Sequence, residues 1–366
     1  MIIKSLELKD YRNFADLRLD FSEKTNILYG DNAQGKTNIL EALYLSGVSK
    51  SHRGSRDKDM VRFGQEEAHI RTVIEKDGEK QQIDIHLRKG KAKGIAVDRF
   101  PLKRAADLFG VLNVVFFSPE DLQIIKNAPS YRRNFINTEL CRIDRIYCAN
   151  LVRYNRAVTQ RNMLLRDAEI HPDLLQMLPV WNEQLMRYGS SLISRRELFI
   201  RDLNILTAQI HGGLTGDKED LLISYSKNTE IDNFEKRLRE NEQKDLRLHT
   251  TSVGPHRDDI DFQINGSSVR YFGSQGQQRS AALSLKLAEI ELLREQIHDS
   301  PVLLLDDVLS ELDNSRQNFL LQNIENVQTV MTCTGLDEFV RNRIQVDRIF
   351  SVVNGTVTER SIDPDE

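Results

Sequence analysis

The octapeptide GDNAQGKT near the start of the chain constrains the fold more than any other feature. It matches the pattern GxxxxGK(S/T) at every fixed position, follows an apolar stretch ending at Tyr29, and opens a helical pattern from Lys36. That context, between a strand and a helix, is the one a phosphate-binding loop requires. The glycines let backbone N–H groups turn toward phosphate oxygens, and the helix N-terminus adds partial positive charge. The loop therefore predicts a nucleoside triphosphate site.

We expect ATP and Mg²⁺ as the cofactors of this site. Lys36 should reach the β- and γ-phosphates and act catalytically, and the Thr37 hydroxyl should ligate Mg²⁺. The alternative is a chance glycine-rich turn, which would not need the strand and helix flanks. The residues predicted to bind nucleotide are Gly30, Asp31, Asn32, Ala33, Gln34, Gly35, Lys36 and Thr37.

A second segment that suits Mg²⁺ binding and ATP hydrolysis is an apolar run, Val302 to Leu305, that is followed by Asp306 and Asp307. A continuous apolar run is typical of a buried parallel strand, and open α/β sheets bind ligands beyond the carboxyl ends of their strands. We expect Asp306 to hold Mg²⁺ directly or through water, and Asp307 to polarise the attacking water. Alone, such a run indicates an ordinary strand and turn; the phosphate loop favours the functional interpretation.

The bulk composition is that of a globular protein without a strong overall charge. Of 366 residues, 39% are hydrophobic and 29% are charged, with a formal net charge of -4, so any nucleic-acid surface has to be a local patch. The charged N-terminal segment predicts no signal peptide, and the lack of a run of about 18 apolar residues predicts no membrane span. We therefore expect a cytoplasmic protein. Its three cysteines, Cys141, Cys148 and Cys333, suit no disulfide framework or zinc knuckle.

The pattern along the chain predicts an α/β domain interrupted by a helical insertion. Strand-like alternation dominates the first part, whereas Ser118 and Pro119 form a helix start. From there to about residue 245 most segments suit helices, and sheet patterns return afterwards. We predict a discontinuous head domain over residues 1–118 and 246–366, with a mostly helical lobe over 119–245 that serves DNA binding and dimer clamping. Two apolar stripes predict packed helices: Ile143, Tyr147, Leu151, Tyr154 and Val158, and Trp181, Leu185, Tyr188, Leu192 and Phe199.

Between the loop and the carboxylates lies SQGQQRS, from Ser274 to Ser280, followed by a helical run. Ser274, the Gly276 N–H and the helix dipole make a second anion site. The segment resembles the signature motif of ABC-type ATPases, in which Ser274, Gly276 and Gln277 would face the γ-phosphate on the other protomer. LSELD after the carboxylates resembles the D-loop of the same ATPases. Taken alone, either segment is an ordinary helix cap or turn; their order and spacing favour the ABC-type interpretation.

Over nearly its full length the chain resembles the RecF family, in the SMC-like branch of ABC ATPases. The motifs are LKDYRNF, GDNAQGKT, SHR at Ser51, FSPEDL at Phe117, GPHRDD at Gly254, SQGQQRS and LLLDDVLSELD. The resemblance implies an ABC-type head, Arg12 and Asn13 near the nucleotide, an ATP-dependent homodimer, and the recombination mediators RecR and RecO as partners. The insertion is too short for the long coiled coil of true SMC proteins.

The strand pattern from Thr329 to Gly335 departs from transporter-type ABC proteins. It has no histidine where a switch histidine usually contacts the γ-phosphate, so we expect Thr332 or Thr334 as a weaker donor and slow hydrolysis. The turn from Phe117 to Asp121 is the expected place of the Q-loop, although it contains no glutamine.

A local excess of basic residues predicts the DNA surface. Between Lys126 and Arg166 nine basic residues face two acidic ones, a net charge of +7 in an acidic chain. Arg142, Arg145, Arg153 and Arg156 are expected opposite the first apolar stripe and suited to sequence-independent phosphate contacts. A solvated helix face is the alternative, although such faces usually mix signs. The turn containing Arg88, Lys89, Lys91 and Lys93 is interpreted as a solvated hairpin tip.

These features predict an ATP-dependent switch of recombinational repair and replication-fork maintenance that binds duplex DNA and single-strand junctions. Two other classes of protein are alternatives. A membrane transporter's nucleotide-binding subunit is disfavoured by the basic helical insertion, and binding to a membrane protein would support it. A phosphate-loop kinase has no need of SQGQQRS, and phosphate transfer to a small acceptor without DNA stimulation would support it.

Overall fold

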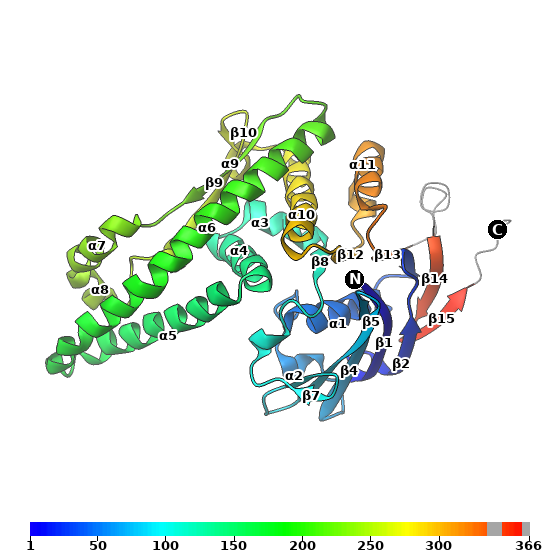
Figure 1. Ribbon diagram of the computed structural model, residues 1–366, viewed down its shortest axis with the longest axis horizontal. Helices are drawn as coiled ribbons and strands as arrows, with labels where there is room; N and C mark the ends of the chain where they lie inside the picture. The colour runs from blue at the N-terminus through cyan, green and yellow to red at the C-terminus, as the bar shows by residue number, and fades with distance from the viewer. Residues whose placement is uncertain (335–345, 361–366) are drawn as a thin grey trace. The chain divides into compact units, whose positions relative to one another are not determined.

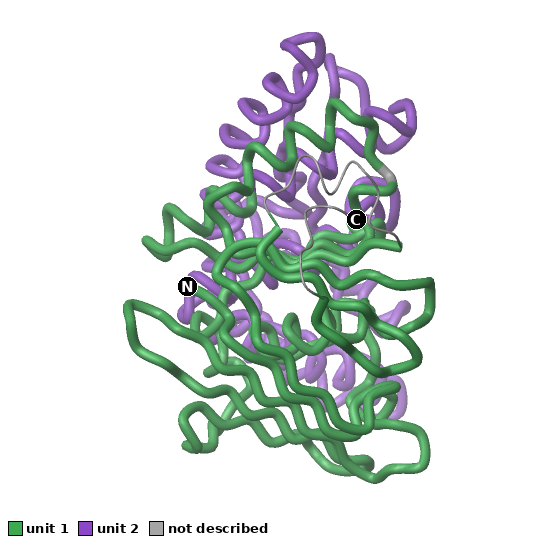
Figure 2. Tube along the Cα trace, turned by 90° about the vertical axis from the view of Figure 1, so that its right-hand side faces the viewer, with its two compact units in different colours: residues 1–121, 289–366 green, residues 122–288 purple. Residues whose placement is uncertain are grey.

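The computed structural model describes residues 1–334 and 346–360. The chain divides into two compact units: Met1–Asp121 with Glu289–Glu366, and Leu122–Ala288 (Figure 2). The discontinuous organisation matches the prediction, and the first boundary differs by three residues. The second boundary was predicted wrongly at residue 246, since residues 246–288 belong to the second unit. Gly335, predicted as the end of a strand, lies outside the described residues.

Two sheets make up most of the first unit. The parallel sheet has the order β15-β14-β3-β13-β12-β8, with only β15 antiparallel to its neighbour among the described strands. The second sheet is antiparallel, in the order β2-β1-β4-β5-β6-β7. The strands are β1 (Ile2–Tyr11), β2 (Phe14–Asp20), β3 (Thr25–Tyr29), β4 (Glu67–Lys76), β5 (Glu79–Arg88), β6 (Gly94–Val97), β7 (Phe100–Pro101), β8 (Val114–Phe117), β12 (Val302–Asp306), β13 (Thr329–Cys333), β14 (Val346–Val353) and β15 (Thr356–Arg360).

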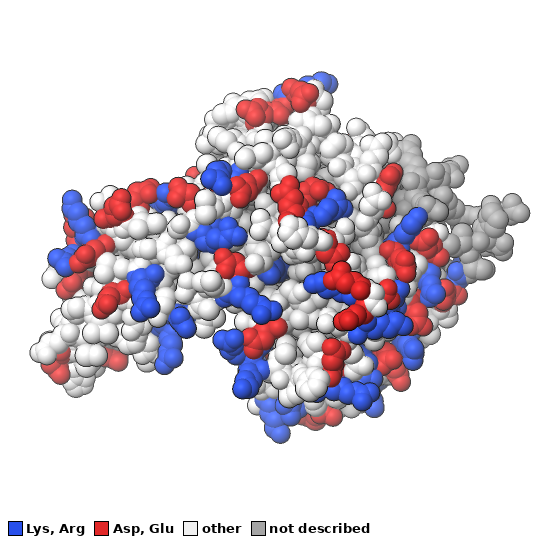
Figure 3. All heavy atoms as spheres, viewed as in Figure 1, with Lys and Arg blue, Asp and Glu red and all other residues white. Residues whose placement is uncertain are grey.

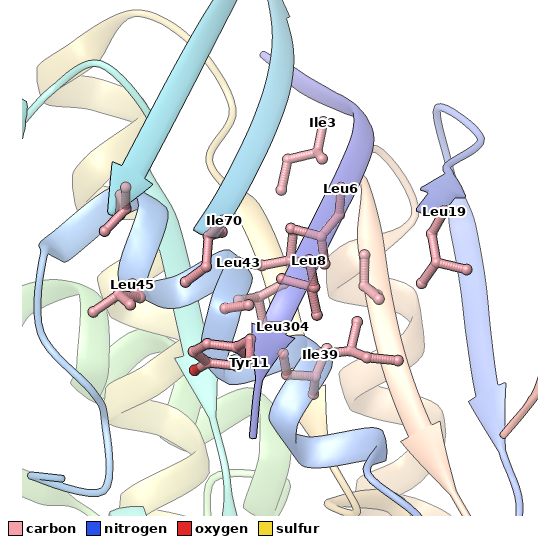
Figure 4. Packing of buried hydrophobic residues seen from close by; sticks show 14 of the residues in the cluster. Ile3, Leu6, Leu8, Tyr11, Leu19, Ile39, Leu43, Leu45, Ile70 and Leu304 are labelled. Atoms are coloured by element: carbon pink, nitrogen blue, oxygen red, sulfur yellow. The ribbon is translucent and has the colours of Figure 1, made fainter. Parts of the chain in front are cut away.

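Helix α1 (Lys36–Val48) lies in the core of this unit and contacts strands of both sheets. Its apolar residues Ile39 and Leu43 pack with Leu8 and Ile70 of the antiparallel sheet and Leu304 of the parallel sheet, and all are buried (Figure 4). Burial on two sides explains why α1 has no polar face toward solvent, and it fixes the phosphate loop at the helix N-terminus. The remaining helices of the unit are α2 (Asp57–Met60) and α11 (Asn314–Ile324).

The second unit is mostly helical, as predicted. Its long helices α5 and α6 run side by side in Figure 1, and the apolar stripes contribute buried residues to them, among them Tyr147, Tyr154, Leu185, Leu192 and Phe199. The helices are α3 (Leu122–Lys126), α4 (Pro129–Ile143), α5 (Arg145–Asp167), α6 (Leu178–Thr215), α7 (Phe234–Glu240), α8 (Glu242–Leu248) and α9 (Val269–Phe272); α10 (Gln275–Ile297) continues into the first unit.

A small antiparallel sheet explains the corrected boundary. Its order is β11-β10-β9, from β9 (Leu221–Ser226), β10 (Asp259–Ile264) and β11 (Ser267–Ser268). Because β9 lies before residue 246 and pairs along its length with β10 after it, the backbone hydrogen bonds hold both in one unit. No disulfide joins Cys141, Cys148 or Cys333. No described helix is long and apolar enough to span a membrane.

Candidate nucleotide-binding site

The phosphate loop connects β3 to α1, as the sequence predicts. Gly35 caps the helix with a φ of 115°, a left-handed conformation that favours glycine. A Cβ at Gly35 would lie 2.5 Å from the nitrogen of the Asn13 side-chain amide, so a larger residue would displace that side chain. Gly30 has a φ of 148°, and a Cβ there would meet the Val352 carbonyl of β14. With glycine at both positions, no side chain keeps an anion away from the backbone of the loop.

The side chains of Lys36 and Thr37 are both fixed by hydrogen bonds. The Lys36 Nζ donates to the carbonyl oxygens of Gly30 and Asp31, 2.8 Å away in the second case. Burial lowers the pKa of Lys36, although the charges of Asp307 and Asp306 oppose the shift. The Thr37 Oγ1 donates to Asp306 Oδ1 at 2.8 Å.

The strand β12 brings its two carboxylates to the same place. Asp306 also accepts from the Thr332 hydroxyl on β13 at 2.9 Å, and the Thr332 Oγ1 in turn accepts from the Asp307 N–H at 2.9 Å. Burial raises the pKa of Asp306, and the two threonine hydroxyls limit the rise. Asp307 has a φ of 53°, an uncommon conformation for a residue with a side chain, and one that functional sites often retain.

A pocket of about 420 Å³ collects these residues. Its lining includes the loop from Asn32 to Thr37, both carboxylates and Thr332. Sequence reasoning assigned no site role to several of the other lining residues. Asn38, His52, Arg53, Ser118, Pro119 and Glu120 complete the wall.

His52 lines this pocket as a neutral ring. It stacks on Phe116 of β8, with ring centroids 4.0 Å apart. Burial lowers the pKa of His52 to about 4, helped by the charges of Arg53 and Arg12 and opposed by Glu41. Its neighbour Arg53 is exposed and donates to Asn38 at 3.4 Å. Ser51 and Arg53 flank His52 in the SHR motif, and this motif was the sequence signal that could have identified His52 as a site residue.

Arg12 and Asn13 occupy different places, although the resemblance implied both near the nucleotide. Asn13 donates to the Gln34 carbonyl at 2.9 Å, so it contacts the phosphate loop. Arg12 binds the buried Glu41 carboxylate with two nitrogens, at 2.7 and 2.8 Å. Neither Arg12 nor Asn13 is among the residues that line the pocket. Glu41 also accepts from Ser51 at 2.5 Å and thereby braces the SHR segment.

The predicted signature segment begins α10 and is described within the second unit. Ser274 caps the helix: its N–H donates to Gln277 Oε1 at 2.9 Å, and its Oγ accepts from the Gln277 N–H at 3.2 Å. Ser274 is exposed, as an anion contact requires, and Gly276 is half-buried. The Gln277 amide also donates to Glu219 at 3.1 Å, and Glu219 lies 3.1 Å from the buried His211.

The two expected turns also have defined geometry. At the expected Q-loop, the Ser118 N–H donates to Asp121 Oδ2 at 2.7 Å, which caps the turn with an acidic side chain in place of a glutamine. At the expected D-loop, the Ser310 hydroxyl donates to the Asp307 carbonyl at 2.7 Å. This contact ties the D-loop to the backbone of Asp307.

The basic helices are only partly available for DNA. Arg145, Arg153 and Arg156 are exposed on α5, and Arg153 lies over the Tyr188 ring. The prediction was wrong for Arg142, which is buried and donates to the buried Glu139 at 2.8 Å. Arg142 lies in the last turn of α4, so the periodicity that placed it with the α5 residues does not continue across the break at Asp144. Positive and negative side chains are interspersed on the face shown in Figure 3.

A phosphate loop and paired carboxylates at the carboxyl edge of a parallel sheet, with a capped helix start carrying SQGQ, define an ABC-type ATPase head. The family model described as RecF/RecN/SMC N terminal domain matches residues 2–358. A DNA replication and repair protein RecF from Agathobacter rectalis is 55% identical over 357 residues, 98% of this chain and 99% of that protein. One from Clostridium botulinum is 44% identical over 343 residues, 92% of this chain and 94% of its own.

Solved structures agree. One described as the recombination mediator protein RecF with ATP in the RecFOR pathway has a TM-score of 0.93 and 33% identity, covering 98% of this chain and 97% of its own. An Smc head domain from Pyrococcus furiosus, 13% identical with a TM-score of 0.57 and covering 99% of this chain and 96% of its own, shares the fold. The chain belongs to the RecF family of DNA replication and repair proteins.

Proposed function

We propose that the chain is an ATP-dependent DNA-binding switch of recombinational repair. The observation that carries the proposal is the convergence of Lys36, Thr37, Asp306 and Asp307 on one pocket. The ATP named for the related RecF structure is the ligand that this pocket suits. The loop glycines and Lys36 would bind its phosphates, with Asn13 holding the loop through the Gln34 carbonyl.

The residues present fit Mg²⁺. Thr37 Oγ1 and Asp306 Oδ1 already point at one another across 2.8 Å, and hydroxyl and carboxylate oxygens are the ligands this ion prefers. When bound, the ion would neutralise charge on the phosphates. Thr332 would keep Asp306 oriented, and Asp307 would accept a proton from, or orient, the attacking water. Residues 329–334 contain no histidine, and the Thr332 hydroxyl already donates its one proton to Asp306, which leaves Thr334 as the weaker donor to the γ-phosphate and favours slow turnover.

The signature segment supports a shared site in a homodimer. Ser274 is exposed at the start of a 23-residue helix, where the N-terminal N–H groups favour an anion. We infer that each Ser274 binds the γ-phosphate held by the partner's phosphate loop. Closure would then depend on ATP, and hydrolysis would reopen the dimer.

The second unit would provide the DNA contacts, through Arg145, Arg153 and Arg156 on α5. Duplex DNA next to single-strand gaps is the proposed substrate. The related RecF structure is described in the RecFOR pathway, which supports RecR and RecO as partners in loading the recombinase.

Sedimentation velocity tests the proposal. The wild-type chain should sediment as a dimer with ATP, Mg²⁺ and gapped DNA and as a smaller species without nucleotide. Lys36→Ala should abolish the shift, whereas Lys80→Ala, a control at an exposed position on β5, should retain it. An unchanged sedimentation coefficient on adding ATP to the wild-type chain would contradict the switch.

A further inference from the structure

Three side chains gather on the exposed face of the antiparallel sheet. His69 on β4 and His86 on β5 are direct register partners, and Glu67 precedes His69 by two residues on the same strand. Alternation along β4 sends Ala68 and Ile70 into the core and leaves Glu67 and His69 outside. The sheet therefore holds all three on one face, at positions fixed by backbone pairing.

Their donor atoms face one another. Glu67 Oε2 lies 2.9 Å from His86 Nε2, and Glu67 Oε1 lies 3.9 Å from His69 Nε2. The two imidazole rings stack with centroids 4.0 Å apart and an angle of 21° between their planes. One donor atom from each residue lies within 4.8 Å of the other two. The carboxylate thus spans two parallel rings and presents one oxygen to each.

We propose that Glu67, His69 and His86 bind a divalent transition-metal ion, with Zn²⁺ as the best match. Imidazole nitrogen and carboxylate oxygen bind Zn²⁺ at about 2.0–2.2 Å, so a tetrahedral site separates its donor atoms by roughly 3.4 Å. The observed separations are 2.9 Å from Glu67 Oε2 to His86 and 3.9 Å from Glu67 Oε1 to His69, so the carboxylate has to rotate to offer one oxygen to an ion held by both rings. Small side-chain rotations are enough to form the site, because the backbone already supplies the register.

The surroundings favour a metal over a simple ion pair. A hydrogen bond between Glu67 and His86 needs no second imidazole, yet the His69 ring stacks on the His86 ring. The nearby Arg71 is engaged by Asp84 at 2.7 Å and by Glu7 at 3.5 Å, which offsets its charge.

The site has room for a further ligand. His69 and His86 also line a pocket of about 720 Å³ on the first unit, together with Ile95 and Pro101. A metal with three protein ligands keeps an open position. That position would take water or an anionic group entering the pocket, which differs in lining residues from the nucleotide pocket.

Isothermal titration of the full chain with ZnCl₂ tests the proposal, in excess Mg²⁺ so that the oxygen ligands around Asp306 do not compete. The wild-type chain should bind one Zn²⁺ that His69→Asn and His86→Asn each weaken by more than about tenfold. Glu67→Gln should weaken it by a smaller factor. Co²⁺ in place of Zn²⁺ should give the intense visible absorption of a four-coordinate site.

His249→Asn is the matched control, since His249 pairs with Glu169 at 3.4 Å without a second histidine. It should leave the titration unchanged. Circular dichroism of each variant checks the fold, which exposed substitutions on one face of the sheet should preserve. The proposal fails if folded His69→Asn and His86→Asn bind Zn²⁺ as the wild-type chain does, or if His249→Asn weakens binding equally.

Discussion

The basic residues of α4 and α5 divide into two classes with opposite expected effects. Arg145, Arg153 and Arg156 are exposed on α5, whereas Arg161 on the same helix is fully buried. Arg161 donates to Asp245 at 2.7 Å, and neither side chain has any exposure to solvent. The sequence predicted DNA contacts for the three exposed residues and counted Arg161 only in the basic excess between Lys126 and Arg166. We therefore compare the triple change of the exposed arginines to Gln with the single change Arg161→Met.

The structure gives the expected magnitudes. Each lost phosphate contact flattens a log–log plot of DNA affinity against salt by about 0.9, so three contacts correspond to about 2.7. The triple variant should change the free energy of unfolding by no more than about 0.5 kcal/mol, as is usual for surface substitutions. Arg161→Met leaves the Asp245 charge buried without its partner, which should cost about 3–5 kcal/mol of stability.

Fluorescence anisotropy with labelled duplex DNA, across a salt series with ATP, measures the slope, and urea unfolding measures stability. The triple variant should lose slope and retain its urea midpoint, and Arg161→Met should do the reverse at concentrations where it is folded. An unaltered slope for the triple variant would refute the α5 surface. The basic turn from Lys89 to Lys93 would then be the next candidate, where Lys93 pairs with Asp57 at 2.9 Å and Lys89 with Glu66 at 3.8 Å.

Three other predictions concern the nucleotide site. Asp307→Asn should retain ATP, slow hydrolysis and accumulate the dimer, because an amide cannot accept a proton as a carboxylate does; loss of ATP affinity in calorimetry would instead make Asp307 a metal ligand. Ser274→Arg should keep ATP affinity but not dimerise, and mixing it with Lys36→Ala should restore part of the ATPase rate by forming one intact shared site; a folded mixture without recovery would exclude sharing. The lowered pKa of His52 means that the unfolded chain binds more protons between pH 6.5 and about 4, so stability should fall as pH falls through that window, by up to about 3 kcal/mol, and His52→Gln should flatten the urea-midpoint profile.

Contiguous motifs were the predictable part of this molecule. The phosphate loop, Thr37 and Asp306 follow from local patterns, because each motif occurs next to the strand or helix that it requires. The structure brings Thr37 and Asp306 within hydrogen-bonding distance. Thr332 was predicted only as a donor near the γ-phosphate, and it also orients Asp306. Their chemical roles stay predictions.

The features that the sequence did not predict depend on contacts between residues that lie far apart in the chain. The burial of Glu41 and its pairing with Arg12, 29 residues earlier, arise only when β1 and α1 pack together. Arg142 belongs to the same basic stretch as the exposed arginines, but its side chain is buried and paired with Glu139. The boundary error at residue 246 has the same origin, because a strand pattern does not identify its pairing partner.

Helix α10 joins the signature segment to the carboxylate strand within one chain. It begins at the Ser274 cap in the second unit, and its residues from Glu289 onward belong to the first. From Gln277 to Ile297 it has neither glycine nor proline, so it has no residue that favours a kink. The next described strand is β12, which ends in Asp306. Under the proposed function, Ser274 and Asp306 of one chain would serve two different nucleotides, and the sequence joins them through this one helix and a short connection.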